Sequence, residues 1–291
     1  MLVVCLTGGI GAGKSTAARM LAEFGAHTMS LDDIARGVLD PGTDGTREVA
    51  ELWPEAVRDG VVDRQFLAGI VFSDDAALRR LNSITHPRTW SAAELLLAEW
   101  EQTDPSGIAV IELALLAQSP RKYQAHLNMV IAADLSVRIE RLVRLRGMSE
   151  DDARSRIASQ ARQERLGELA DIWVDNSDGE GQLRGELAAV WADRLEPFAE
   201  NLTAGRRVKG LPVPPDSGAV ARIMARLEHH GLDPRQGGPM NAEPGSAADV
   251  GTGTRIRNDE AALRRAGFLP VLGESRFVSA DPAYEFEVDS D

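Results

Sequence analysis

The stretch TGGIGAGKSTA, residues 7–17, decides the fold of this chain. It follows an apolar run, LVVCL at residues 2–6, that is typical of a buried strand. Downstream, apolar residues recur at the spacing of one helix face, namely Ala17, Met20, Leu21 and Phe24. Gly25 is expected to end that helix. The sequence therefore predicts a strand, a glycine-rich loop and a helix in this order.

The loop matches G-x-x-x-x-G-K-[ST], the pattern of a phosphate-binding P-loop, and a chance match in a chain of this length has a probability of about one in a hundred. Glycines let backbone N–H groups approach phosphates, and the helix N-terminus adds a partial positive charge. We expect Lys14 to reach the β- and γ-phosphates of a nucleotide and Ser15 to ligate magnesium. Lys14 is one of only three lysines in the chain, which strengthens the match.

Four further apolar runs predict buried strands, at residues 27–30, 108–113, 127–132 and 172–174. Helical segments separate them, so we predict an α/β fold of the P-loop NTPase type with a doubly wound, parallel, five-stranded sheet. Such sheets bind ligands at the carboxyl ends of their strands. The candidate positions are therefore residues 30–33, 112–116 and 175–176.

Two segments outside the predicted sheet have possible roles in binding substrates. Residues 40–104 are predicted to form a mainly helical insert that covers an acceptor, with a helix beginning at Pro87. Residues 138–165 carry eight arginines, which alone would indicate a solvated helix pair with salt bridges. Beside a P-loop they instead favour an arginine-bearing lid that neutralises a transferring phosphoryl group. The candidates are Arg141, Arg144 and Arg146.

Composition limits the partners and the location. The formal net charge of −13 opposes nonspecific binding to nucleic acid and to anionic membranes, so we expect neither as a partner. The single cysteine, Cys5, cannot form an internal disulfide and is expected to be a buried, inert thiol. No apolar stretch is long enough for a signal peptide or a membrane span, so a cytoplasmic location is expected.

Six segments follow one another along about the first 200 residues: LTGGIGAGKST, LDDIARGVLDPGT, GVVDRQFLAGIVFSD, LNSITHP, RLVRLRGMSEDDARSRIASQ and ADIWVDNSD. In their sequence and order they resemble the dephospho-CoA kinase family. The resemblance implies magnesium-dependent transfer of the γ-phosphoryl group of ATP to the ribose 3′-hydroxyl of dephospho-CoA, the last step of coenzyme A synthesis.

The resemblance also implies roles for particular residues. ATP and magnesium would be held by Gly11, Ala12, Gly13, Lys14, Ser15 and Thr16. Asp32 and Arg36 would lie on the acceptor side. His86 would either line that side or be an N-terminal helix residue satisfied by local hydrogen bonds. The catalytic set would be Lys14, Asp32, Arg141 and Arg144.

The chain departs from the family pattern at three positions. Ser30 and Gln118 stand where the family has an aspartate and a glutamate, and Leu145 stands where it has a second lid arginine. Asp32, or alternatively Asp33, is then expected to act as the base toward the acceptor hydroxyl. Two other interpretations stay open: a catalytically weakened protein that binds ATP or a coenzyme A precursor, and a P-loop kinase for nucleosides or nucleotides.

We predict three parts along the chain: a dephospho-CoA kinase-like P-loop domain at 1–203, a linker at 204–218, and a C-terminal segment at 219–291. The last part faintly resembles the GrpB-like domain that actinobacterial members of the family often carry, in shortened and degenerate form. His229 and His230 are adjacent and would face different directions on a helix, so no metal site is expected there. The sequence does not predict the oligomeric state.

Overall fold

A computed structural model describes residues 1–160, 163–205, 216–232, 255–256, 259–270, 276–283 and 287–290. The chain forms two compact units. The first, the core unit, comprises Met1–Thr28 and Asp104–Asp291, and the second, the insert unit, comprises Met29–Thr103. Among the described residues, no helix combines the length and the apolar composition that crossing a bilayer requires.

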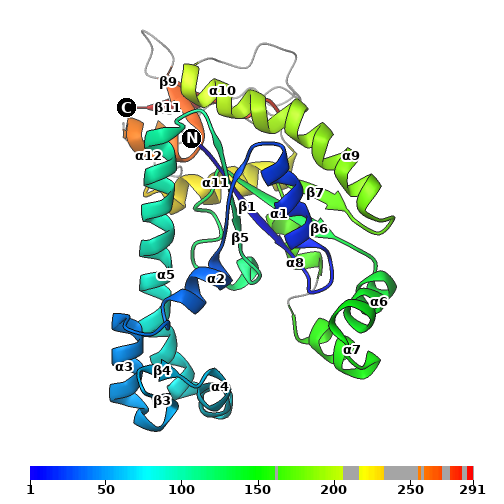
Figure 1. The fold of residues 1–291 in the computed structure, drawn as a ribbon. Helices are drawn as coiled ribbons and strands as arrows, with labels where there is room; N and C mark the ends of the chain where they lie inside the picture. The colour runs from blue at the N-terminus through cyan, green and yellow to red at the C-terminus, as the bar shows by residue number, and fades with distance from the viewer. Residues whose placement is uncertain are drawn as a thin grey trace. The chain divides into compact units, whose positions relative to one another are not determined.

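The core unit is built on a parallel five-stranded sheet of order β2-β5-β1-β6-β7 (Figure 1). The strands of this sheet are β1 Leu2–Gly8, β2 His27–Ser30, β5 Ile108–Glu112, β6 Leu127–Ala132 and β7 Ile172–Asp175, and the last two residues of β2 begin the insert unit. All five coincide with runs that the sequence predicts as strands. The central strand, β1, pairs with β5 on one side and β6 on the other, which places the loop after β1 at the middle of the sheet's carboxyl edge.

Successive side chains of a strand point to opposite faces of the sheet, and in this fold helices cover both faces. Leu2, Val4 and Leu6 belong to one buried cluster, with side chains from three helices: α1 Lys14–Glu23, α9 Glu180–Val190 and α10 Glu196–Ala204. Cys5 belongs to another cluster, with the 3₁₀ helix η2 Leu116–Gln118 and helix α8 Gln163–Leu169. This is the predicted doubly wound fold.

The thiol of Cys5 is buried and free, as predicted. Burial raises its pKa to about 12, because the charged thiolate would lose its hydration. The thiol therefore stays protonated and unreactive in the folded protein.

The predicted lid corresponds to two helices of the core unit, α6 Leu135–Arg146 and α7 Glu150–Ser159. Gly147, in the left-handed conformation, ends α6. Ser149 caps α7 by accepting a hydrogen bond from the N–H of Asp152 at 3.1 Å. Ile139, Leu142 and Ala153 form the buried contact between the two helices.

The C-terminal part of the core unit contains helices α11 Ser217–His229 and α12 Glu260–Arg265. It also contains a sheet of order β8-β11-β10-β9 that the sequence analysis did not predict. Its strands are β8 Arg255–Ile256, β9 Phe268–Pro270, β10 Arg276–Ser279 and β11 Glu287–Ser290. Most of the predicted linker, residues 206–215, lies outside the described residues.

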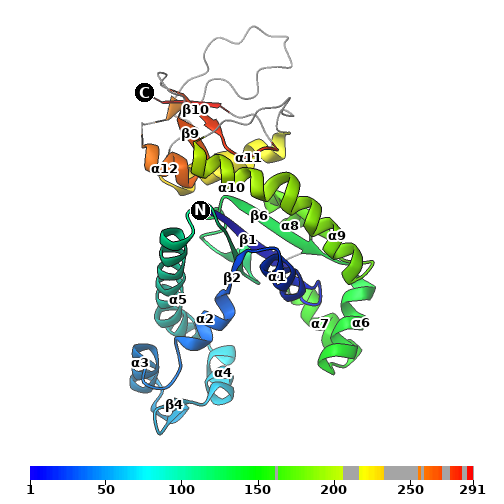
Figure 2. The same ribbon diagram turned by 45° about the horizontal axis from the view of Figure 1, so that its top comes forward.

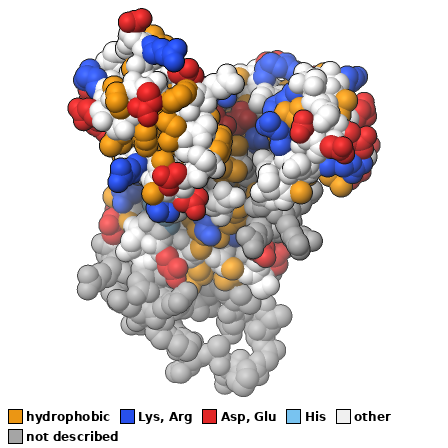
Figure 3. All heavy atoms as spheres, turned by 90° about the horizontal axis from the view of Figure 1, so that it is seen from below, with side chains coloured by type: hydrophobic (Ala, Val, Ile, Leu, Met, Phe, Trp, Pro, Cys, Tyr) orange, Lys and Arg blue, Asp and Glu red, His pale blue; other side chains and the backbone are white. Residues whose placement is uncertain are grey.

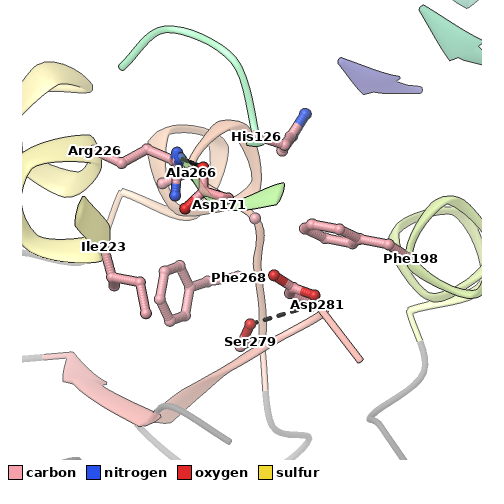
Figure 4. A pocket seen from close by; sticks show the side chains of 10 residues that line it. His126, Asp171, Phe198, Ile223, Arg226, Ala266, Phe268, Ser279 and Asp281 are labelled. Atoms are coloured by element: carbon pink, nitrogen blue, oxygen red, sulfur yellow. Dashed lines mark hydrogen bonds and ion pairs between the residues drawn. The ribbon is translucent and has the colours of Figure 1, made fainter. Parts of the chain in front are cut away.

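A buried carboxylate joins this C-terminal part to the main sheet of the core unit. Asp171, just before β7, accepts hydrogen bonds from Arg222 Nε at 3.0 Å and from Arg226 Nη2 at 2.6 Å. Arg194 and Asp281 form a second ion pair at 2.7 Å. Figure 4 shows Arg226 beside Asp171, next to a cavity of about 20 Å³. That volume is about the size of one water molecule.

His126 connects the same two parts as a neutral imidazole. Its Nδ1 accepts from the N–H of Val3 at 3.0 Å, so the proton lies on Nε2, which faces the Arg264 carbonyl oxygen at 3.3 Å. Burial lowers the pKa of His126 to about 3, because a charged ring would be desolvated.

The insert unit is mainly helical, as predicted (Figure 2). Its helices are α2 Leu31–Gly37, α3 Asp44–Leu52, α4 Arg64–Ser73 and α5 Asp75–Thr103, with a 3₁₀ turn η1 Pro54–Ala56. A short hairpin joins β3 Val57–Arg58 to β4 Val61–Val62. Val49, Leu67 and Ile84 lie in its apolar core.

The prediction that a helix begins at Pro87 is wrong. Helix α5 begins at Asp75 and continues through Pro87 to Thr103. A proline inside a helix removes one backbone hydrogen bond, here the one that the Ser83 carbonyl would accept. Two side chains just after the proline bond to other carbonyls of the same turn. Arg88 Nη1 donates to the Ile84 carbonyl at 2.8 Å, and Thr89 Oγ1 donates to the Thr85 carbonyl at 2.8 Å. Buried residues on both sides of the proline keep the helix continuous.

Candidate functional site

The phosphate loop, Gly8–Gly13, leads from β1 directly into α1. Gly11 and Gly13 have φ angles of 79° and 97°, in the left-handed region that disfavours other residues. A Cβ on Gly11 would also lie 2.8 Å from the Arg138 carbonyl oxygen. The Ala17 N–H donates to the Gly13 carbonyl at 3.0 Å, which closes the first turn of α1. The loop therefore presents the N-terminal amides of α1 at its open side.

The polar side chains of the motif converge at this loop. The Lys14 ammonium lies across it, 3.1 Å from the Gly8 carbonyl oxygen and 3.4 Å from that of Gly9. Ser15 Oγ donates to Glu112 Oε1 at 3.2 Å, and Glu112 is the last residue of β5. Thr16 is half-buried in the first turn of α1.

A hydroxyl and a carboxylate are oxygen ligands of the kind that magnesium prefers. The Ser15–Glu112 pair therefore fits a magnesium ion that also takes oxygens from phosphates and water. In the part of the chain that the structure describes, no group of three or more His, Cys, Asp or Glu side chains could hold a metal by itself. His229 and His230 are not part of such a group.

Of the predicted lid arginines, Arg141 faces the loop. Its Nη2 donates to the Asn176 carbonyl at 2.8 Å, while Asn176 Nδ2 donates to the Ala12 carbonyl at 2.8 Å. Arg141 Nη1 is buried and has no hydrogen-bond partner among the described residues. It would lie 3.9 Å from a Cβ built on Gly13. Because a buried N–H without an acceptor is costly, Arg141 Nη1 is a candidate donor to a ligand at the loop.

The other two arginines are placed differently. Arg144 and Arg146 are exposed in the last turn of α6, with the exposed side chain of Leu145 between them. In that position they can respond to a ligand only by a change in side-chain or helix position.

The predicted acceptor residues all lie in the insert unit. Ser30 caps α2 by accepting from the N–H of Asp33 at 3.2 Å. Asp33 is paired with Arg36 at 2.7 Å, whereas Asp32 is exposed in the first turn of α2. His86 is exposed within α5, so the alternative that placed it at a helix N-terminus is wrong.

Four residues contribute to the loop without having been selected as site residues. Glu112 ends β5 and Asn176 follows β7, and this position at the carboxyl end of a strand was the sequence feature that could have identified them as site residues. Arg138 Nε donates to the Ile10 carbonyl at 2.9 Å, and Gln160 Oε1 accepts from the Ile10 N–H at 2.6 Å. Nothing in the local sequence distinguishes Gln160 from other polar residues that follow a helix.

On the face shown in Figure 3, basic and acidic side chains are interspersed over the described residues and form no large patch of one charge. With a net charge of −13, attraction for a polyphosphate must come from the local groups at the loop.

A comparison with protein families shows which family this chain belongs to. The family model for dephospho-CoA kinase matches residues 2–182. The chain belongs to the dephospho-CoA kinase family. The matched residues run from β1 into α9 and so include the phosphate loop and the lid helices.

Individual members of the dephospho-CoA kinase family agree with this assignment. The dephospho-CoA kinase of Thermobifida fusca is 40% identical over 63% of this chain and 91% of that protein. The one of Mycolicibacterium paratuberculosis is 39% identical over 78% of this chain. The present chain spans only 57% of the length of that relative. Among solved structures, TT1252 from Thermus thermophilus is 30% identical over 66% of this chain and 96% of that chain, with a TM-score of 0.58.

Proposed function

We propose that this protein transfers the γ-phosphoryl group of ATP to the ribose 3′-hydroxyl of dephospho-CoA and releases coenzyme A and ADP. The observation that best supports this proposal is the phosphate loop, where Lys14, Ser15 and Glu112 lie together at the carboxyl edge of the sheet. The chain that carries this loop belongs to the dephospho-CoA kinase family. Phosphoryl transfer depends mainly on positioning and charge neutralisation, which are what these groups supply.

ATP is assigned to the loop and the first turn of α1. The amides of Gly11, Ala12, Gly13 and the residues that begin α1 would donate to its phosphates, and Lys14 would leave the loop carbonyls for the β- and γ-phosphates. Thr16 would contribute from the first turn. The unpartnered Nη1 of Arg141 would find its acceptor on the nucleotide. Arg144 would approach the transferring group when the lid closes over it.

Magnesium is assigned to Ser15, with Glu112 as the accompanying carboxylate. When bound, the ion supplies charge neutralisation at the β- and γ-phosphate oxygens. Before that, the hydroxyl of Ser15 is held by Glu112, so β5 already orients the side chain toward the site.

The acceptor is assigned to the insert unit, to Asp32, Arg36 and His86. Asp32 is favoured over Asp33 as the base because the carboxylate of Asp33 is engaged by Arg36. As the bond between the acceptor oxygen and the γ-phosphorus forms and the bond to the β-phosphate oxygen breaks, the hydroxyl proton would pass to Asp32. Ser30 cannot take that proton at neutral pH, and in this structure it serves as the cap of α2.

The test is to incubate the purified protein with magnesium, ATP and dephospho-CoA, and to measure coenzyme A and ADP. Nucleosides in place of dephospho-CoA are the matched acceptor control. Product from dephospho-CoA alone supports the proposal, and product from nucleosides alone selects the alternative of a nucleoside kinase. Binding of both substrates without product would contradict the proposal and select the weakened binding protein.

A further inference from the structure

One residue of the phosphate loop, Ile10, is bonded to the lid helices through both its N–H and its carbonyl. The Ile10 N–H donates to Gln160 Oε1 at 2.6 Å, and the Ile10 carbonyl accepts from Arg138 Nε at 2.9 Å. Gln160 is the C-cap residue of α7, and Arg138 lies in the first half of α6. Both bonds cross more than a hundred residues of sequence.

The side chain of Ile10 makes a third contact. It packs against the buried cluster of Ile139, Leu142 and Ala153, which joins α6 to α7. The middle of the loop is therefore attached to the same two helices by its N–H, its carbonyl and its side chain. A glycine-rich loop has little conformational preference of its own, so contacts such as these decide the direction of the neighbouring amides.

Arg138 is buried as well as bonded. Its side chain is close to Gly9, where an added Cβ would lie 2.4 Å from Arg138 Nη2. Burial lowers the pKa of this guanidinium. A buried arginine so close to a phosphate loop could act by its charge or by the geometry of its Nε–H donor, and the two roles call for different substitutions.

We propose that Arg138 and Gln160 are positioning residues that fix Ile10, and that they act on nucleotide affinity through the conformation of the loop. Holding Ile10 at both ends of its backbone sets the direction of the amides of Gly11, Ala12 and Gly13, which follow it. The inference rests on the proposed binding of ATP at this loop, but not on the identity of the acceptor. On this proposal the lid helices α6 and α7 help to set the phosphate-binding conformation of the loop.

The key variants use the shape of glutamine. In Arg138→Gln the side-chain amide nitrogen occupies the same place along the chain as Nε of arginine, so a donor to Ile10 is kept while the charge is lost. Arg138→Met loses both. Gln160→Leu removes the acceptor for the Ile10 N–H at similar volume. Arg154→Ala, on α7, is the control, because Arg154 is exposed and pairs with its helix neighbour Glu150.

The measurement is the Kd of the magnesium complex of a fluorescent ATP analogue, with circular dichroism to check the fold of each variant. Arg138→Met and Gln160→Leu are expected to weaken binding about five- to tenfold, as the loss of one hydrogen bond predicts. Arg138→Gln should restore most of the affinity, and Arg154→Ala should bind like the wild type. In turnover assays the KM for ATP should rise while the KM for dephospho-CoA stays unchanged.

The outcomes distinguish failure of the proposed function from failure of the inference about Arg138 and Gln160. No binding by the wild-type protein would overturn the proposed function and this inference with it. Normal wild-type binding with equal losses in Arg138→Gln and Arg138→Met would show that charge, not position, is what Arg138 supplies, and would overturn the inference alone. Unchanged binding in Gln160→Leu would also overturn it, and this variant decides the matter if Arg138→Met fails to fold.

Discussion

Replacing Asp171 by asparagine should remove a large part of the stability of the core unit. The carboxylate is 4% exposed and accepts three hydrogen bonds, from Arg222 Nε, Arg226 Nη2 and the backbone N–H of Asn128. Both guanidinium groups are themselves nearly buried, at 11% and 5% exposure. Asparagine keeps the shape but leaves two buried cations without a counter-charge, and its amide nitrogen would face another donor.

Breaking a buried ion pair by changing one partner costs about 3 to 5 kcal/mol, because the remaining charge stays desolvated. We expect a loss in this range for Asp171→Asn. The matched control is Glu150→Gln, the same acid-to-amide change at an ion pair with Arg154 in which both side chains are more than half exposed. Exposed helix pairs contribute about 0.3 to 0.5 kcal/mol, so this variant should be nearly neutral.

The assay is urea unfolding of the whole chain, followed by circular dichroism at neutral pH and fitted to a free energy of unfolding. A loss of less than about 1 kcal/mol in Asp171→Asn, or one equal to that in Glu150→Gln, would refute the reasoning. Either result would mean that the buried carboxylate does not compensate the arginines of α11.

Other predictions concern the site and two buried groups. Lys14→Ala should lower turnover at least a hundredfold because the ammonium is lost from the phosphate loop, and an undiminished rate would place the phosphates elsewhere. Ser30→Asp keeps a good helix cap and should raise turnover if a missing base limits the rate, which steady-state kinetics can check. The pKa of His126 is lowered, so its neutral form stabilises the fold above pH 6.5, and that stability is lost as pH falls toward 3. About 2 kcal/mol should disappear between pH 7 and pH 5, and the His126→Gln variant should show a correspondingly smaller loss in urea titrations. Cys5 should react with iodoacetamide at pH 8 only as fast as the protein unfolds, so rapid labelling of native protein would contradict its burial.

Much of the fold could be predicted because its signals are local. The loop after β1 is one continuous stretch, and both its glycines and its lysine act within a few residues of each other. The three central strands, β1, β5 and β6, could be found from their apolar runs because both faces of the sheet are covered there. The edge strands β2 and β7 are only partly buried and carry a weaker signal. The start of α5 was mispredicted since Pro87 is a strong local signal, while the buried face that carries the helix past it depends on its neighbours.

The sequence by itself determined the phosphate-loop pattern and its place between β1 and α1, because such a loop needs only consecutive backbone amides and one lysine. Tertiary structure alone decided which distant side chains complete the site. Ser15 meets Glu112 because β1 and β5 are neighbours, and Ile10 meets Arg138 and Gln160 because the lid packs on the loop. Such contacts depend on the relative positions of whole elements. The place of Glu112 at a strand end marked it as a candidate, but only the fold decided that it meets Ser15.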